Sequence, residues 1–178
     1  MHKLLAGLPL ALSVLSAPVL ADDEMFAPEV KTIKMTHVQS GKSAGMVKVE
    51  QTDDGLVFTP SLTGLKPGGH GFHVHENPSC DSAMKKGESV PAGAAGSHYD
   101  PEKTKSHGYP WAEHNHLGDL PLLYVNDKGE ATTPVLAPRL DMDDLKGRAL
   151  MVHEGGDNYS DSPQKLGGGG PRAACGVI

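Results

Sequence analysis

Short runs of alternating apolar and polar residues recur along this chain and limit the folds open to it. Neighbouring side chains in a β-strand point to opposite faces, so alternation with a period of two indicates a strand with one buried face. No segment shows the 3.6-residue period of an amphipathic helix. Eight runs between Gly, Asp or Pro turn signals are predicted strands: 30–35, 46–50, 56–59, 69–76, 122–125, 132–136, 149–153 and 173–178.

This strand count predicts one all-β domain, either a closed barrel or a sandwich. The 22 glycines and 14 prolines among 178 residues suit a fold with many turns, and the length suits a single domain. Residues 77–120 and 154–172 show no strand pattern and are expected to form two long loops. Loops of such length are usually functional or disordered, and histidines in the first favour a function.

The N-terminus has the order of a secretory signal. Lys3 precedes an apolar run over 4–15, and residues 17–21 end in a pattern typical of cleavage after Ala21. The alternative is an uncleaved anchor, but the run is short for a membrane span of about 20 residues. We therefore expect a cleaved signal over 1–21 and a mature domain over 22–178 that lies outside the cytoplasm and has no membrane partner.

The charge of the chain argues against a nucleic-acid partner. The whole chain carries a net charge of −6, and removal of the signal segment would take away the positive charge of Lys3 and make the net charge more negative. Nucleic-acid binding depends on basic surfaces that neutralise phosphates, so an acidic chain is a poor candidate.

Two cysteines, Cys80 and Cys175, are expected to form one disulfide, because exported proteins meet an oxidising compartment. The enclosed loop is long, and chain entropy then gives a stabilisation of about 4–5 kcal/mol. The alternative is a pair of buried free thiols.

Histidines carry the strongest chemical signal. Seven of the ten lie between residues 73 and 153: His73, His75, His98, His107, His114, His116 and His153. His73 and His75 are two apart on a predicted strand, so both point to one face and can meet one metal ion. His116 and Asp119 flank a glycine at a spacing that can chelate a single ion, and nitrogen with carboxylate oxygen suits zinc.

Other parts of the chain can complete such sites. His98 and His107 lie in the same long loop as His116 and could close a tetrahedron, and His153 could fold back beside His73. The chain contains no His-Glu-x-x-His motif, nucleophile elbow or phosphate-binding loop, so the common hydrolase and nucleotide-binding classes are not indicated.

Five segments, taken in order, resemble copper,zinc superoxide dismutase of the bacterial periplasmic type, over residues 30–178. They are Gly71-Phe72-His73-Val74-His75-Glu76, Gly96-Ser97-His98, His116-Leu117-Gly118-Asp119, Val152-His153-Glu154 and Arg172-Ala173-Ala174-Cys175-Gly176-Val177-Ile178. The resemblance implies an eight-stranded Greek-key β-barrel with two long functional loops. It also implies one copper ion and one zinc ion per subunit.

The resemblance also implies a role for each matching residue. Copper is expected on His73, His75, His98 and His153, and zinc on His98, His107, His116 and Asp119. His98 would then bridge both metals as an imidazolate. Asp157 is expected to accept hydrogen bonds from His73 and His107, and Cys80 and Cys175 match the disulfide of the family.

A catalytic role is implied for Arg172 as well as for His98, because a guanidinium near copper attracts and orients an anion. Three loop lysines, Lys85, Lys86 and Lys165, are candidates for the rim of that site, with ordinary solvated lysines as the alternative reading. His114 matches no ligand position and is expected to be structural.

The activity implied is dismutation of superoxide to dioxygen and hydrogen peroxide, which would protect the periplasm. The alternative is a non-catalytic periplasmic copper- and zinc-binding or metal-delivery module. Such a module would be expected to lose a copper ligand, Arg172 or His98, and all of these are present. The sequence leaves monomer and homodimer equally open.

Overall fold

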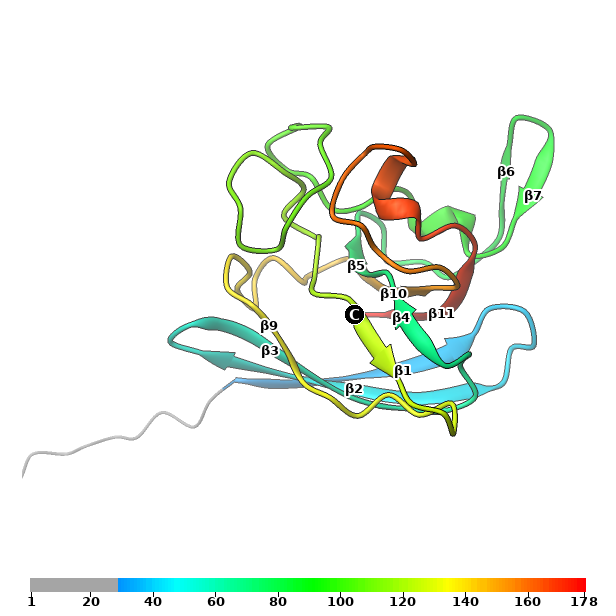
Figure 1. The fold of residues 1–178 in the computed structure, drawn as a ribbon, viewed down its shortest axis with the longest axis horizontal. Helices are drawn as coiled ribbons and strands as arrows, with labels where there is room; N and C mark the ends of the chain where they lie inside the picture. The colour runs from blue at the N-terminus through cyan, green and yellow to red at the C-terminus, as the bar shows by residue number, and fades with distance from the viewer. Residues whose placement is uncertain (1–28) are drawn as a thin grey trace, which may run out of the picture.

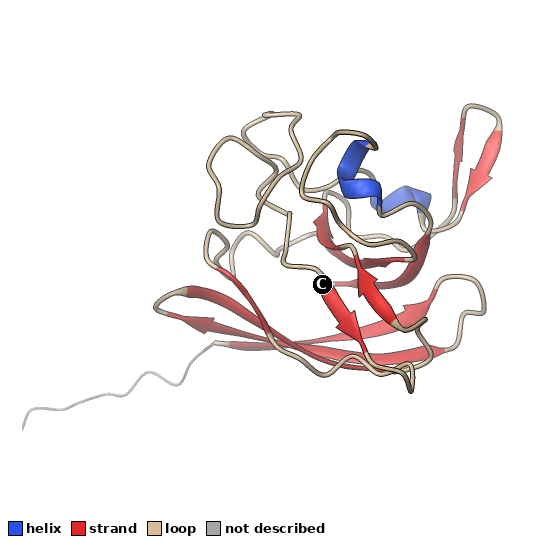
Figure 2. Ribbon diagram, in the orientation of Figure 1, coloured by secondary structure: helices blue, strands red, loops and turns tan. Residues whose placement is uncertain are grey.

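The computed structural model of this chain describes residues 29–178, so the predicted signal segment lies outside the described residues. Strands account for nearly all regular structure, and the only helical elements in this range are two short 3₁₀ turns (Figure 2). The strands are β1 (Val30–His37), β2 (Ser43–Thr52), β3 (Gly55–Leu62), β4 (Gly68–His70), β5 (Phe72–His75), β6 (Ala83–Lys85), β7 (Glu88–Val90), β8 (Leu123–Val125), β9 (Val135–Ala137), β10 (Ala149–His153) and β11 (Arg172–Val177). The turns are η1 (Gly93–Ala95) and η2 (Lys165–Gly168).

Seven strands form one antiparallel sheet in the order β5-β10-β11-β1-β2-β3-β9, and β4 pairs with β8. The neighbours β1, β2 and β3 are consecutive, whereas β11 returns from the far end of the chain to lie beside β1. This is the Greek-key arrangement, and the sheet curls so that β1–β3 face the layer that holds β4, β5 and β10 (Figure 1). The predicted all-β Greek-key barrel is confirmed.

Each of the eight predicted strands overlaps an observed strand, but the run 132–136 forms a strand only from Val135, and the run 69–76 is divided between β4 and β5. The division falls at Gly71, whose N–H donates to Gly155 O at 2.8 Å and whose carbonyl accepts the N–H of His153 at 2.8 Å. The chain therefore leaves its pairing with β8 at this residue and begins to pair with β10.

The core lies between the curled layers and is built from the inward residues of each strand. Phe58 on β3 and Phe72 on β5 meet edge to face with ring centroids 5.9 Å apart. Burial of one such large apolar side chain stabilises the fold by about 1.5–3 kcal/mol. The core thus fixes one face of β5 and leaves the other face to the loops.

The long segment 77–120, expected to lack strands, contains the β6–β7 hairpin, which projects from the body of the molecule (Figure 1). Lys86 and Gly87 both have positive φ, of 52° and 87°, and this is the geometry of a tight two-residue hairpin turn. The expected disulfide joins Cys80 in this segment to Cys175 on β11. Within residues 29–178, no helix is long and apolar enough to cross a membrane.

Candidate metal centre

The centre begins on β5, a strand buried on both faces. Phe72 and Val74 point into the core, so alternation turns His73 and His75 to the opposite face. This outer face is closed by the two long loops, and His73 and His75 are only 0% and 1% exposed. Imidazoles at such positions need partners, because an unpaired buried polar group is costly.

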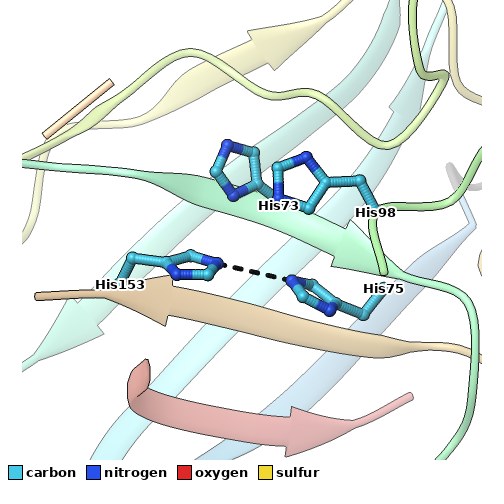
Figure 3. A group of neighbouring side chains, drawn as sticks. All are labelled: His73, His75, His98 and His153. Carbon is cyan, nitrogen blue, oxygen red and sulfur yellow. Dashed lines mark hydrogen bonds between the residues drawn. The ribbon is translucent and has the colours of Figure 1, made fainter. Parts of the chain in front are cut away.

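The neighbouring strand β10 supplies His153. Phe72 pairs with Val152 and His73 with Met151, and the register between β10 and β11 shifts at the Val152/His153 step. A bulge of this kind re-aims the side chain that follows it. As a result Nε2 of His153 lies 3.4 Å from Nε2 of His75, as Figure 3 shows.

The loop 77–120 docks on the edge of β5 through backbone hydrogen bonds. Val74 donates its N–H to Gly118 O at 2.9 Å and accepts the N–H of Tyr99 at 2.8 Å. A side chain at Gly118 would collide with the Val74 carbonyl, so the close approach requires glycine. This docking brings His98 beside His75 and Asp119 beside His73.

One group of possible ligands joins the two strands to the loop. His73, His75, His98 and His153 each offer a nitrogen, and these nitrogens lie within 4.8 Å of one another (Figure 3). The other ring nitrogen is held for three of them: His73 Nε2 donates to Asp157 Oδ2 at 2.8 Å, and Nδ1 of His75 and of His153 lies 3.1 Å from Gly96 O and Gly170 O. Each ring therefore has a fixed orientation and one nitrogen left for a metal ion.

A second group surrounds a single carboxylate oxygen. Asp119 Oδ1 lies 2.9 Å from Nδ1 of both His98 and His107, and 3.4 Å from Nδ1 of His116. The ligand atoms of His73, His98, His107 and Asp119 lie within 4.8 Å of one another, and His116 meets this group through Asp119. His73 lies close to this cluster because its ring stacks on His98 at a centroid distance of 3.8 Å. Its Nε2, however, donates to Asp157 and does not face Asp119.

Unpaired nitrogens mark where ions fit. Within the described part of the chain, His73 Nδ1, His98 Nε2, His107 Nδ1 and His116 Nδ1 are buried and lack a satisfying hydrogen-bond partner. Buried polar atoms are almost always paired, so this concentration is the mark of missing ligands. Nitrogen-rich sites suit copper, and three imidazoles with one carboxylate suit zinc.

Comparison with known proteins agrees with these donor sets. Residues 43–178 match the family described as copper/zinc superoxide dismutase. The chain belongs to the copper/zinc superoxide dismutase family. A superoxide dismutase [Cu-Zn] of Photobacterium leiognathi is 58% identical over 83% of this chain and 85% of that protein. One from Haemophilus parainfluenzae is 50% identical over the whole length of both chains.

Solved structures give the same result. The Cu/Zn superoxide dismutase from Brucella abortus is 50% identical, covers 84% of this chain and 99% of its own, and superposes with a TM-score of 0.81. The two histidine groups described above fit the copper and zinc from which the family takes its name.

Burial sets the protonation of the imidazoles in this dismutase fold. It lowers the pKa of His73, His75 and His98, and it lowers that of His153 to about 4. These rings are neutral at pH 7, the form that binds metals. His107 differs: burial lowers its pKa, but close contacts with the carboxylates of Asp119 and Asp157 outweigh burial and raise it to about 9.

Asp157 ties the two groups together. Its Oδ2 accepts from His73 Nε2 at 2.8 Å, and its Oδ1 accepts from His107 Nε2 at 2.7 Å. A side chain at Gly167 would collide with this carboxylate, and the backbone there has φ of 70°, so glycine is required. The loop 154–172 thus orients a histidine in each group.

A cavity of about 420 Å³ leads to the first group, and Arg172 and Lys85 line it with His75, His98 and His153. The Arg172 guanidinium donates to the carbonyls of Ala92 and Gly96, which fixes its position. Of the other two loop lysines, Lys165 lines a different cavity on the side of His116, and Lys86 forms the hairpin turn.

His114 lies apart from the other clustered histidines. It lines a small cavity with Glu102, Glu113 and Arg139. Its backbone is left-handed, with φ of 65°.

Two positioning residues have no signal in the sequence. Asp161 accepts the N–H of His107 at 2.8 Å and of Leu166 at 3.0 Å, so it joins the two loops next to a ligand. His70 places Nδ1 at 2.6 Å from the carbonyl of His153 and Nε2 at 2.7 Å from that of Lys66. An isolated aspartate or histidine reveals such a role only when the fold places it.

Proposed function

We propose that this chain disproportionates superoxide into dioxygen and hydrogen peroxide at a centre of one copper ion and one zinc ion. The observation that carries the proposal is that both donor groups share His98 and that His98 lines a cavity together with Arg172. Membership of the copper/zinc superoxide dismutase family supports the same reaction.

The ligand assignment follows the free nitrogens. Copper is assigned to His73, His75, His98 and His153, which form the first group. Zinc is assigned to His98, His107, His116 and Asp119, because three Nδ1 atoms surround one Asp119 oxygen. His73 is assigned to copper because its unpaired nitrogen is Nδ1, while its Nε2 already donates to Asp157.

His98 is the bridging residue in this proposal. Its Nδ1 faces Asp119 in the zinc group, and its Nε2 has no hydrogen-bond partner among the described residues. Two dications at the two nitrogens of this neutral ring would favour loss of its one remaining N–H proton, which would make the ring an imidazolate. The same ring can hold a proton at Nε2 when that nitrogen is not bound.

The residues of the chain bind the anion and deliver a proton. Arg172 and Lys85 are cationic groups in the cavity, and their field concentrates superoxide there although the chain as a whole is acidic. When bound, copper supplies one-electron redox chemistry and zinc supplies a fixed positive charge. One superoxide leaves as dioxygen, and the other gains an electron and two protons, one of which His98 Nε2 is placed to donate.

The site of action proposed is the periplasm. This rests on the signal segment over 1–21 and on the bacterial origin of the relatives. Expression of the whole chain in a bacterium followed by release of the periplasm should yield a protein that begins at Asp22. A cytoplasmic protein that retains Met1 would contradict this.

A direct assay tests the activity. The mature chain loaded with copper and zinc should remove pulsed superoxide at a rate close to the diffusion limit. The rate should decline as salt screens the cavity. Metal content measured on the same sample is the control. Full occupancy of both metals without activity would favour the metal-binding module instead.

A further inference from the structure

A second cavity, of about 550 Å³, opens on the other side of His98. His98 and His116 line it, whereas the first cavity reaches His98 together with His75 and His153. Ser97, His98 and Leu166 line both cavities, so the two adjoin at His98. The first also reaches His75 and His153 of the first donor group, and the second also reaches His116 of the second group.

The two openings differ in charge. The first is lined by Arg172 and Lys85, and none of the described residues that line it is acidic. The second contains three carboxylates and three lysines: Glu76, Asp100, Asp161, Lys103, Lys105 and Lys165. The charges of the second cavity cancel, whereas the first is cationic, which favours an anion and repels a dication. A dication is therefore opposed less at the second cavity, where carboxylates can also attract it.

Backbone amides fix the carboxylates of the second cavity. Asp100 accepts N–H groups from Thr104 at 3.0 Å and Lys105 at 2.8 Å, and Asp161 accepts those of His107 and Leu166. These amide contacts hold both carboxylates in fixed positions along the cavity.

The inner end of this cavity holds the free donors. His116 is 5% exposed, His98 is 2% exposed, and each has a buried nitrogen without a partner in the described chain. Carboxylates therefore occupy the opening and unpaired imidazole nitrogens occupy the inner end. This order suits a hydrated dication that sheds water in steps as it moves inward.

We propose that the second cavity is the route by which zinc ion reaches its ligands, separate from the opening used by superoxide. The inference rests on the proposed metal assignment and adds a path to it. Zinc can then reach His98 and His116 without passing through the cavity that contains Arg172.

The test measures the association rate of zinc ion with the mature chain carrying one copper ion. Zinc ion alone is mixed in stopped flow at low salt, and a competing zinc indicator reports uptake. Lys103→Glu makes the second cavity more negative by two charges, and Lys85→Glu makes the same change in the first. Lys165→Glu is a replacement should Lys103→Glu fail to fold.

Lys103→Glu should raise the association rate by about threefold to tenfold at low ionic strength, and near 1 M salt should remove the gain. Lys85→Glu should leave zinc uptake unchanged. A larger response to Lys85→Glu, an equal response to both, or no response to either would overturn the route. Superoxide removal by the unmodified protein is measured separately, so failure of the activity is not confused with failure of the route.

Discussion

The side of this centre that we assign to copper and the side that we assign to zinc are built from different kinds of structure. His73, His75 and His153 lie on β5 and β10, where backbone pairing on both strands fixes them. His107, His116 and Asp119 lie in a loop, and carboxylates and backbone contacts with a second loop hold them. A ladder of strand hydrogen bonds forms with the barrel, whereas the loop depends on a few side chains and the metal itself.

This difference predicts that the copper site is formed before the metal binds, whereas the zinc site depends on the side-chain contacts that hold its loop. Changes to those contacts should lower the affinity for zinc more than the affinity for copper. Changes to the shared ligand should lower both affinities.

The largest effect is expected from His98→Ala, because His98 lies in both groups and is the one ring that the proposed assignment gives to both metals. Superoxide removal should fall by more than about 100-fold, since losing a ligand costs more than the 10- to 100-fold typical of its supporting partners. Both metals should bind more weakly in equilibrium dialysis. His114→Ala is the control and should change neither, and full activity in His98→Ala would refute the bridge.

Loss of the disulfide is expected to come next. Cys80→Ser frees the start of the loop 77–120 from β11 and should lower the free energy of unfolding by about 2–5 kcal/mol. Chemical denaturation of the metal-free chain measures it. The zinc side should lose more affinity than the copper side. An equal loss on both sides would remove the distinction between strand-held and loop-held ligands.

A smaller effect is expected from substitution of the two aspartates that orient His107. Asp157→Asn weakens hydrogen bonds to His73 and His107, and zinc affinity should fall by about 10- to 100-fold. Asp161→Asn touches only the backbone of His107 and should cost less. Competition with a chelator measures both, and the comparison fails if Asp157→Asn weakens copper more than zinc.

The smallest effect is a pH dependence of the metal-free chain. The pKa of His107 is raised to about 9, so its stabilisation is complete below about 6.5 and is lost as pH rises through 9. The pKa of His153 is lowered to about 4, so its neutral buried form costs stability as pH falls from about 6.5 toward 4. Denaturation midpoints should therefore be highest near pH 6–7.

A matched variant isolates the alkaline part of this profile. His107→Gln cannot carry the proton, so the decline between pH 6.5 and 9 should flatten. Zinc binding to the unmodified chain at pH 7 should also release about one proton, because His107 must give up its Nδ1 proton to bind. Titration in buffers of different ionisation enthalpy measures that proton. No release would mean that His107 is neutral before zinc binds.

Alternation alone predicted the eight strands and placed His73 and His75 on one face, because a strand's period depends only on its own residues. Ordered motifs predicted the family, copper and zinc. The strand break at Gly71 and the β6–β7 hairpin were not predicted. The break depends on a change of pairing partner at Gly71, which the residues of the strand do not encode. The hairpin strands are only three residues each, too short for an alternating pattern to be recognised.

Tertiary structure alone decided how the two sides meet. The bulge before His153 turns its ring toward His75, and Asp161 reaches His107 from 54 residues away. The contact of Asp157 with His107, 50 residues away, was expected only from the family resemblance. The tertiary structure also places two of the loop lysines in different cavities, Lys85 in the first with Arg172 and Lys165 in the second. Such contacts depend on how two long loops pack against the barrel and each other, and no local pattern of residues encodes that packing.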